Sequence, residues 1–395
     1  MNKLLKGTII GALALSMLAL AFAGGLVLGR GTRSIAVPGV GDASATPERA
    51  ASEVRSIIER EALAPSDDAS MTAGVVKGML ESLGDPYALY FDEEHYGYFN
   101  EQTEGTFYGI GITISERDGK PYVVSVIPDT PAARAGLKSE DIIASIDGVV
   151  RDKWDLDEVV KRIRGEEGTK VKLGILRDGS ETPKEFSITR AKIDVPNIEK
   201  EIVDGDIGYI RLYSFSDPAA EDIREAIDDL TKKGAKGFVL DLRDNPGGLL
   251  SSSVDVLSLF VKDGVAVSVE ARVEDLNETY RVSGDVATDA PLVLLINENS
   301  ASASEIVAGG LQDYKRATLV GVTSFGKGSV QQIEELSFGG ALKLTIAHYL
   351  TPKGRIIDKK GVVPDVEVKM EPEKQADKKT DTQYQRALTE LKKLL

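Results

Sequence analysis

The spacing of apolar residues divides the chain into three stretches with different predicted secondary structure. From 46 to 104, apolar residues recur every three or four positions, which predicts helices, and Thr46 followed by Pro47 marks the first helix start. From 105 to 190, short runs alternate apolar and polar residues, which predicts a small β-rich domain. From 191 to 370, nearly continuous runs of Val, Leu and Ile alternate with helical stretches. This pattern predicts an α/β core whose strands are buried on both faces.

Residues 1–30 combine a basic start with a long apolar run. Lys3 and Lys6 precede residues 7–29, which contain no charged side chain and would span roughly 34 Å as a helix, enough to cross a bilayer core. The basic flank predicts that the N-terminus stays in the cytoplasm and that the rest of the chain is exported. Two interpretations remain open, a retained anchor and a secretory signal cut after Ala21–Ala23. The anchor is favoured because the apolar run continues past that site.

Two further stretches flank the globular regions. Residues 31–45 are small, contain Gly and Pro and lack periodicity, so we interpret them as a linker. Residues 371–395 begin as a charged spacer and end in a predicted helix. One face of this helix is apolar, which predicts packing or a dimer contact through Tyr384, Ala387, Leu388, Leu391 and Leu395. Together with the helices at 46–83, this helix leads us to predict a homo-oligomer, a dimer or larger.

Composition excludes several classes of function. Of the 395 residues, 42% are hydrophobic and 28% are charged, which is typical of a chain that folds around a core. The net charge of −15 argues against nucleic-acid binding, because phosphate contacts require a basic surface. The chain contains no cysteine, which excludes thiol nucleophiles, disulfides and thiolate metal sites. We predict neither a metal nor another cofactor.

Candidate chemistry begins at a junction between a predicted strand and a predicted helix. The strand ends at Asn297, and three serines that alternate with alanines, Ser300, Ser302 and Ser304, open the helix. The free N–H groups and the positive dipole end of a helix N-terminus favour an anionic nucleophile or an oxyanion. The alternative is a helix-capping serine among small, closely packed neighbours. The residues alone do not choose between these uses or among the three serines.

A serine nucleophile needs a base, and the chain contains two histidines. Neither His95 nor His348 lies in a recognisable catalytic motif. A lysine can replace histidine when burial lowers its pKa far enough to leave it neutral. Lys327 is the candidate, because it lies between two glycines and far from acidic residues in the sequence, and Gln331 can orient its amine. The alternative is an ordinary turn lysine in solvent.

A second glycine-rich turn, in the motif DLRDNPGGLL, also connects a predicted strand to a predicted helix. The backbone N–H groups at Gly247 and Gly248 can supply one half of an oxyanion hole, and the residue that follows the nucleophilic serine can supply the other half. The alternative is a strand-to-helix turn without a catalytic role. The sequence does not distinguish between the two glycines.

The β-rich stretch resembles a PDZ domain of the circularly permuted type found in bacterial proteases. The resemblance rests on YGIGI, VIPDTPAARAGLKSEDIIASIDG and VVKRIRGEEGTKVKLGILRDG. It implies a groove in which the C-terminal carboxylate of a peptide meets free N–H groups while the peptide main chain extends a sheet edge. The implied peptide-binding residues are Tyr108, Gly109, Ile110, Gly111 and Ile112. The alternative is a glycine-rich strand entry that binds no ligand.

Four motifs together resemble the carboxy-terminal processing proteases, also called tail-specific proteases. They are DLRDNPGGLL, NSASASEIVAGGLQDY, SFGKGSVQ and GRIIDKKGVVPDV. The resemblance covers residues 46–395 in the family's order of helical region, PDZ domain and protease core. It implies a ClpP/crotonase-like α/β core with an inserted PDZ domain. The implied site residues are the nucleophile Ser302, the general base Lys327, the supporting Gln331, and an oxyanion hole from Ala303 and the Gly247/Gly248 turn.

We therefore predict an exported serine endopeptidase with a Ser-Lys dyad, located in the periplasm or cell envelope and anchored through residues 7–29. The expected substrates are proteins or peptides with apolar C-termini that the PDZ domain captures. Arg162 or Arg164 is a candidate to contact the core and report the position of the PDZ domain. One alternative is a catalytically silent PDZ scaffold or adaptor for exported tails. Another is a protease that stays inactive until an activating partner protein or a substrate tail docks.

Overall fold

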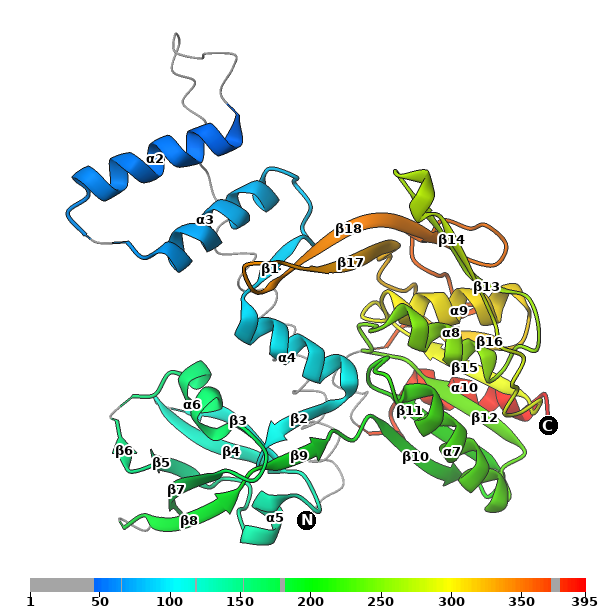
Figure 1. Ribbon diagram of the computed structural model, residues 1–395. Helices are drawn as coiled ribbons and strands as arrows, with labels where there is room; N and C mark the ends of the chain where they lie inside the picture. The colour runs from blue at the N-terminus through cyan, green and yellow to red at the C-terminus, as the bar shows by residue number, and fades with distance from the viewer. Residues whose placement is uncertain (1–45, 65, 118, 152, 178–181, 371–376) are drawn as a thin grey trace.

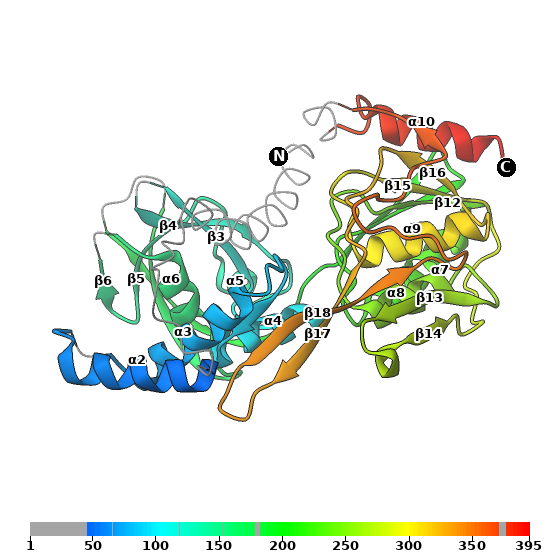
Figure 2. The ribbon, with the colours of Figure 1, turned by 90° about the horizontal axis from the view of Figure 1, so that it is seen from above.

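The computed structural model describes residues 46–64, 66–117, 119–151, 153–177, 182–370 and 377–395. The predicted anchor at 7–29, the predicted linker and the start of the predicted spacer lie outside these ranges. Within them, no helix is long and apolar enough to cross a membrane. Figure 1 shows the small β-rich domain and the α/β core as separate parts, and Figure 2 shows them from above on opposite sides of the molecule.

The N-terminal region is helical, as its periodicity predicts. Its helices are α2 (Pro47–Glu61), α3 (Asp68–Glu81) and α4 (Glu93–Glu104). The Thr46 hydroxyl caps α2 by accepting a hydrogen bond from the Arg49 N–H. The apolar face of α2 is uncovered, since this helix has no buried residue and Val54 and Ile57 are 55% and 42% exposed. The spacing of apolar residues therefore predicts the helix correctly, but within the described residues no other element covers its apolar face.

A short strand connects this region to a distant part of the chain. β1 (Leu89–Phe91) pairs antiparallel with β18 (Ala341–Leu350). In the turn before β1, the Asp85 carboxylate accepts a hydrogen bond from the Tyr87 N–H at 2.9 Å. Residues 85–91 are therefore fixed to a sheet that the C-terminal half of the chain builds.

The β-rich domain contains a sheet in the order β3-β4-β5-β7-β8, with β6 paired to β5. Its elements are β3 (Ile112–Arg117), β4 (Lys120–Val126), α5 (Pro131–Ala135), β5 (Ile142–Ile146), β6 (Val149–Val150), α6 (Leu156–Ile163), β7 (Lys170–Leu176) and β8 (Lys184–Thr189). The domain has its own core, in which Val123, Ile146, Val171 and Leu173 are fully buried. β3 is an edge strand, because β4 is its single strand neighbour among the described residues.

Two paired strands form a neck where the chain enters and leaves this domain. β2 (Thr106–Gly109) pairs antiparallel with β9 (Ala191–Asp194). The sequence analysis places 191–194 in the α/β core, but these residues lie beside β2 and do not join the core sheet. The difference arises because the core and the neck both use short apolar strands, and sequence alone does not show which strands pair.

The α/β core is built on a sheet in the order β10-β11-β12-β15-β16-β19. Its strands are β10 (Ile198–Val203), β11 (Ile207–Leu212), β12 (Gly237–Asp241), β15 (Leu292–Ile296), β16 (Thr318–Gly321) and β19 (Val366–Glu367). Neighbouring strands are parallel, except that β10 is antiparallel to β11. β12 and β15 are buried along their whole length, as their continuous apolar sequences predict for strands covered on both faces.

Helices cover both faces of this sheet. One face carries α7 (Ala219–Lys232), α8 (Leu250–Ser258) and α9 (Ala303–Asp313). The other face carries α10 (Thr382–Lys392), which packs against it through Tyr384, Ala387, Leu388 and Leu391. The C-terminal helix is therefore a packed part of its own core, which is one of its two predicted uses. Leu395, expected on the same face, lies beyond the end of α10 and is 48% exposed.

A second sheet extends from the core toward the N-terminal region. It contains β13 (Val265–Ala271), β14 (Glu278–Arg281), β17 (Ser329–Glu335), β18 and β1, with a short 3-10 helix (Glu274–Leu276) between β13 and β14. β17 and β18 form an antiparallel ribbon, and Figure 2 shows this ribbon and α4 between the core and the β-rich domain. The sequence analysis does not single out β17, which follows directly on a glycine-rich loop.

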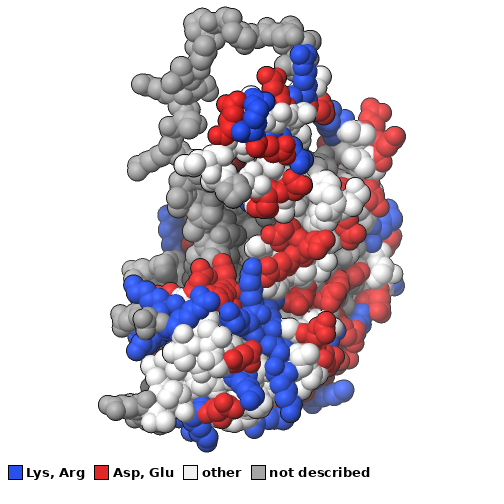
Figure 3. All heavy atoms as spheres, turned by 60° about the vertical axis from the view of Figure 1, so that its left-hand side comes forward, with Lys and Arg blue, Asp and Glu red and all other residues white. Residues whose placement is uncertain are grey.

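Charged side chains are spread unevenly over the surface. Figure 3 shows basic side chains gathered over the lower part of that view, which holds the β-rich domain, and acidic side chains more abundant above it. On this face, the negative charge of the chain therefore lies mainly outside the β-rich domain.

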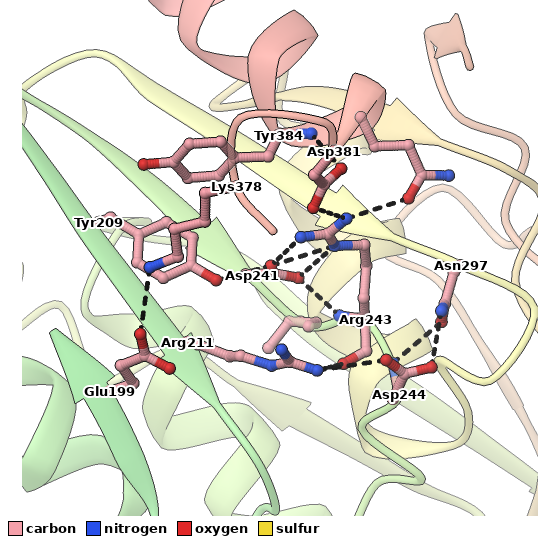
Figure 4. A network of polar contacts seen from close by, with 12 residues as sticks. Glu199, Tyr209, Arg211, Asp241, Arg243, Asp244, Asn297, Lys378, Asp381 and Tyr384 are labelled. Carbon is pink, nitrogen blue, oxygen red and sulfur yellow. Dashed lines mark hydrogen bonds and ion pairs between the residues drawn. The ribbon is translucent and has the colours of Figure 1, made fainter. Parts of the chain in front are cut away.

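A buried network of charges joins the C-terminal segment to the core sheet (Figure 4). Arg243, which follows β12, lies 2.6 Å from Asp241 and 2.8 Å from Asp381, and all three side chains are at most 2% exposed. The Tyr209 hydroxyl donates a hydrogen bond to Asp241 at 2.8 Å. Burial alone would raise the pKa of Asp241, but Arg243 lowers it to about 2. The network holds the start of α10 beside the strand that leads to the Gly247–Gly248 turn.

Replacing Asp381 by alanine is expected to lower the free energy of unfolding by about 3–5 kcal/mol. The change removes one of the two carboxylates that neutralise buried Arg243, and it also removes the cap of α10, where Asp381 accepts from the Tyr384 N–H. Urea unfolding followed by circular dichroism measures the loss. Lys392→Ala is the control, because it removes an exposed ion pair of the same helix with Asp204 and should cost less than about 1 kcal/mol. Equal losses in the two variants would contradict this account.

Candidate active site

Ser302 lies at the sharp junction between β15 and α9. Its backbone has φ 55° and ψ −114°, a conformation that is uncommon for serine and that tends to occur at functional sites. The neighbouring serines are buried and hold the loop. The Ser300 hydroxyl donates to the Leu242 carbonyl at 2.8 Å, and the Ser304 hydroxyl donates to the Asn245 carbonyl at 2.9 Å. The geometry therefore favours Ser302 among the three serines that the sequence leaves open.

A buried carboxylate joins this junction to the loop of Lys327. Glu305, in the first turn of α9, is 0% exposed. It accepts hydrogen bonds from the N–H groups of Ser302 at 2.9 Å, Gly326 at 2.7 Å and Lys327 at 2.9 Å, and from the Ser324 hydroxyl at 2.6 Å. The N–H groups of Ser302 and Lys327 share one carboxylate oxygen, Oε2. The two backbone segments are therefore held close together.

Tyr349 of β18 makes a second link between the same two residues. Its hydroxyl lies 2.6 Å from the Lys327 carbonyl oxygen and 3.1 Å from the Ser302 carbonyl oxygen. Burial raises the pKa of Tyr349 well above its ordinary value. The phenol therefore stays protonated and acts as a hydrogen-bond donor at this position.

Lys327 has the surroundings that a lysine base needs. Burial is the main cause that lowers its pKa to about 8, Lys343 lowers it further, and Glu305 and Asp85 oppose the change. The Lys327 Nζ lies 4.6 Å from the centre of the Tyr87 ring. A substantial fraction of this amine is therefore neutral near pH 8, as general-base catalysis requires.

The three predicted catalytic side chains lie in one region but are not all bonded to one another. Among the described residues, the Ser302 hydroxyl and the Lys327 amine are not hydrogen-bonded to each other, and the amine faces the Tyr87 ring. Gln331 of β17 donates its side-chain amide to the Ser329 hydroxyl at 2.7 Å. Catalytic hydrogen bonds are often long before a substrate binds, so this arrangement is compatible with a dyad.

The Gly247–Gly248 turn, which follows β12, lies directly against Ser302. A Cβ at Gly247 would lie 2.9 Å from the Ser302 Cβ and 3.0 Å from the Ala303 nitrogen, so only glycine fits there. The Gly247 N–H already donates to the Asn245 side-chain oxygen at 2.9 Å. In the described part of the chain, the N–H groups of Gly248 and Ala303 have no hydrogen-bond acceptor. The turn therefore offers one N–H that is free to bind an oxyanion.

The two histidines lie outside this constellation. His95 of α4 is exposed and pairs with Asp92 at 2.6 Å. His348 is 57% exposed and lies 4.0 Å from Asp358. Since the adjacent Tyr349 points toward Ser302, His348 points to the opposite face of β18. Lys327 therefore remains the candidate base.

The predicted peptide-binding residues run from the neck into the edge strand of the β-rich domain. Tyr108 and Gly109 belong to β2, and Ile112 begins β3. Ile110 is 1% exposed and packs in the domain core, and its carbonyl accepts a hydrogen bond from the Ala132 N–H at 2.8 Å, so this residue is not accessible to a ligand in this structure. Gly111 has a φ of 86°, which favours glycine.

Arg164 contacts α4 and not the protease core. Its guanidinium pairs with Glu101 at 2.5 Å and lies 4.5 Å from the centre of the Tyr98 ring. Arg162 pairs with Glu158 of its own helix. Neither arginine has the predicted contact with the core in this structure, because α4 lies between the β-rich domain and the core.

Comparison with known protein families identifies two regions of the chain. Residues 206–368 match peptidase family S41, and residues 109–188 match the PDZ domain. A carboxy-terminal-processing protease of Bartonella bacilliformis is 43% identical over 309 residues, which cover 76% of this chain and 70% of that protein. The chain belongs to the carboxy-terminal processing proteases.

A second relative of this carboxy-terminal processing protease, the protease CtpA of Bacillus subtilis, is 39% identical over 305 residues. The match covers 77% of this chain and 65% of the length of the Bacillus protein. The fold is shared with a solved structure of a putative S41 protease from Bacteroides fragilis, at 17% identity and a TM-score of 0.50, over 87% of this chain and 97% of that one. Members of this family are serine peptidases, so the predicted enzyme class is confirmed, as are the predicted fold class and the PDZ domain.

The sequence analysis missed the residues that connect the Ser302 and Lys327 loops of this carboxy-terminal processing protease. Ser302 and Glu305 have the Ser-x-x-Glu spacing of a helix capping box, and this signal could have identified Glu305. Tyr87 and Lys343 have no comparable local signal. They approach Lys327 because β1 pairs with β18, and these strands lie far apart in the sequence.

Proposed function

We propose that this protease cleaves peptide bonds with a Ser302–Lys327 dyad after its PDZ domain captures the C-terminal tail of a protein substrate. Ser302 is the nucleophile, Lys327 is the general base, and Gln331 orients the lysine amine. The observation that carries the proposal is the shared Glu305 carboxylate. It holds the serine junction beside a loop whose lysine has a lowered pKa.

In the proposed reaction, neutral Lys327 takes the proton of the Ser302 hydroxyl while the Ser302 Oγ attacks the carbonyl carbon of the scissile bond. The resulting ammonium group donates this proton to the leaving amine, and the C-terminal product departs. Lys327, neutral again, takes a proton from a water molecule that attacks the ester carbonyl of the acyl-enzyme. The ammonium group then returns the proton to the Ser302 Oγ, and the second product is released.

The oxyanion that forms in each addition step needs N–H donors that are not already used. Gly247 donates to Asn245, so we assign the first donor to Gly248 and the second to Ala303, which follows the nucleophile. Both donors lie near the N-terminus of α9, whose dipole favours negative charge. Gly247 contributes through its lack of a side chain, because a Cβ there would collide with Ser302.

Tail capture is assigned to the free side of β3. A peptide can add to this edge by main-chain hydrogen bonds, since β4 occupies the other side. Ile112 is half-buried against the cluster that contains Val159 and Ile163 of α6, which favours apolar side chains in the peptide. The basic side chains over the PDZ domain in Figure 3 favour the approach of a C-terminal carboxylate. We therefore propose proteins and peptides with apolar C-termini as substrates.

Docking of a tail or of an activating partner protein is proposed to complete the dyad. In this structure the Lys327 amine faces Tyr87 and the Gln331 amide faces Ser329, so both side chains must reorient before Ser302 can transfer its proton. We propose that side-chain rotation alone brings these groups together, because Glu305 already holds the two backbone segments close to each other.

We place the protease outside the cytoplasmic membrane, in the periplasm or cell envelope, held by residues 7–29. The support is the uncharged run that follows Lys3 and Lys6. Fractionation of cells that express the full chain, with external protease added to intact spheroplasts, tests this proposal. Recovery of a protected protein in the cytosolic fraction would exclude it.

A homo-oligomer is proposed on separate grounds. The apolar face of α2 is uncovered within the described residues, and such faces are commonly covered by partner subunits. Analytical ultracentrifugation of the full chain in detergent measures the assembly, and a monomer at all concentrations would exclude it.

Cleavage by the full-length chain is expected to rise with pH through about 8 and to level off above it. Lys327 acts as a base only when neutral, and its neutral fraction grows as the pH passes its lowered pKa of about 8. The profile is measured as kcat/KM for an unfolded model protein between about pH 6 and 10. A midpoint near the ordinary histidine pKa of about 6.5 would instead indicate His348. Absence of cleavage at every pH, even with an apolar C-terminal peptide added, would favour the silent scaffold.

A further inference from the structure

A second lysine shares the surroundings of the proposed base. Lys343 lies on β18, directly opposite Ile333 of β17, and Thr345 lies opposite Gln331. Residues two apart on a strand share a face of the sheet, and directly paired residues share it across strands. Lys343 therefore lies on the same face of the ribbon as Gln331, whose amide also donates to the Thr345 hydroxyl at 3.4 Å.

The N-terminal region closes this cluster from the other side of β18. Leu89 of β1 pairs with Lys343, and Tyr87 lies two residues before Leu89, in the turn that leads into this strand. The centre of the Tyr87 ring lies 4.6 Å from the Lys327 Nζ. Asp85 fixes the turn, since its carboxylate accepts from the Tyr87 N–H at 2.9 Å. Three segments that are distant in the sequence thus meet around one amine.

We propose that Lys343 is a positioning residue of the active site, whose charge acts through Lys327 and keeps that amine ready to accept the serine proton, while Asp85 acts in opposition. This inference rests on the proposed Ser302–Lys327 dyad. It extends the active site beyond the protease core, because Asp85 and Tyr87 belong to the N-terminal region.

The electrostatics of the cluster support opposite roles for the two groups. Like charges in a region poor in water disfavour each other's protonated form, whereas a nearby carboxylate favours it. After burial, Lys343 is the next cause that lowers the pKa of Lys327, and Asp85 raises it. Burial also lowers the pKa of Lys343, and Asp85 opposes this change as well.

The other titratable groups around the two lysines do not reproduce this arrangement. Glu305 raises the pKa of Lys327, but both of its oxygens are occupied by N–H and O–H donors. The remaining groups are neutral or directed elsewhere: the phenols Tyr87 and Tyr349, Asp358, which accepts from the Gly328 N–H, and His348, which lies beside Asp358. Removal of Lys343 is therefore expected to raise the pKa of Lys327.

The first test compares pH profiles of kcat/KM for the full-length chain and three variants. Lys343→Met removes the charge and is expected to move the acid limb upward by about 0.5–1 pH unit, which lowers the rate at pH 7 about three- to tenfold. Lys343→Arg keeps the charge and should retain the parental limb. Asp85→Asn keeps the oxygen that accepts from Tyr87 and should move the limb downward. A lower plateau with an unmoved limb in all variants would reduce Lys343 to a structural role and overturn the proposal.

The second test does not depend on turnover. In a Ser302→Ala background, the Lys327 amine of the full chain is titrated by NMR with ¹³C-labelled lysine, and its signal is identified by its loss in Lys327→Met. A midpoint near 8 in the parent, higher with Lys343→Met and lower with Asp85→Asn, supports the inference. Identical midpoints in the parent and both variants would overturn the inference. If Lys343→Met does not fold, an unchanged midpoint in Asp85→Asn would be enough to overturn it. Full cleavage by Lys327→Ala would instead refute the dyad, and this outcome is separate from the NMR result.

Discussion

Replacing Ser302 by alanine is expected to lower kcat/KM by at least about 10⁴-fold, because removal of the proposed nucleophile leaves only the rate provided by substrate binding and the oxyanion donors. Lys327→Met should cause a loss of similar size, since the serine then keeps its proton. Turnover of an unfolded model protein by the full-length chain at pH 9, where the parental lysine is mostly neutral, measures both losses.

The alternating serines of the same loop supply a matched control for this experiment. Ser304→Ala removes a hydroxyl two residues after Ser302. This hydroxyl is buried and donates a hydrogen bond to the Asn245 carbonyl. This change should lower the free energy of unfolding by about 1–3 kcal/mol but keep the rate within about tenfold of the parent. If Ser304→Ala abolished cleavage and Ser302→Ala did not, the nucleophile would be misassigned, and the strained backbone of Ser302 would need another explanation.

Replacing Glu305 by glutamine is expected to lower kcat/KM by at least about a hundredfold, because displacement of catalytic groups by about 1 Å costs rates of this size. Each carboxylate oxygen accepts two hydrogen bonds, Oε1 from Ser324 and Gly326 and Oε2 from Ser302 and Lys327. A glutamine places an NH₂ group at one of these positions, whichever way its amide is turned. At least one backbone N–H group would then face a donor, because among the four donors only the Ser324 hydroxyl can turn to accept, and the loop that carries this N–H would move.

The measurement for Glu305→Gln is the pH profile of kcat/KM with the fold checked by circular dichroism. Glu305 raises the pKa of Lys327, so loss of its charge should move the acid limb of the profile to lower pH. A lower plateau would therefore result from misplacement of the catalytic groups and not from protonation of the lysine. Glu298→Gln, an exposed acid at the same junction, is the control and should change the rate less than about twofold. A plateau within threefold of the parent would show that Glu305 does not align the two loops.

The parts of this protein that local pattern determines could be predicted from the sequence. β12 and β15 have continuous apolar runs and are covered on both faces, and the PDZ domain has the alternation of half-buried strands. The start of α2 follows from Thr46 and Pro47. Such features depend on the period of a few neighbouring residues, which is visible without knowledge of the rest of the chain.

The features that depend on pairing between distant segments could not be predicted in this way. β2 and β9 form the neck, and β1 completes a sheet with β18, although nothing within each short strand identifies its partner. Ser300, Ser302 and Ser304 are equivalent in the sequence, and they differ in backbone conformation and hydrogen bonding, which the folded loop imposes. The surroundings of Lys327 could not be predicted for the same reason, since Tyr87 and Lys343 approach it from other parts of the chain.

The neck described above makes the PDZ domain exchangeable. β2 and β9 lie side by side, so the chain leaves and re-enters the rest of the protein at points about 5 Å apart. A foreign domain whose own ends are equally close can therefore be grafted between these strands without rerouting the catalytic core. The same core can therefore be combined with different recognition domains, either by protein engineering or by gene recombination.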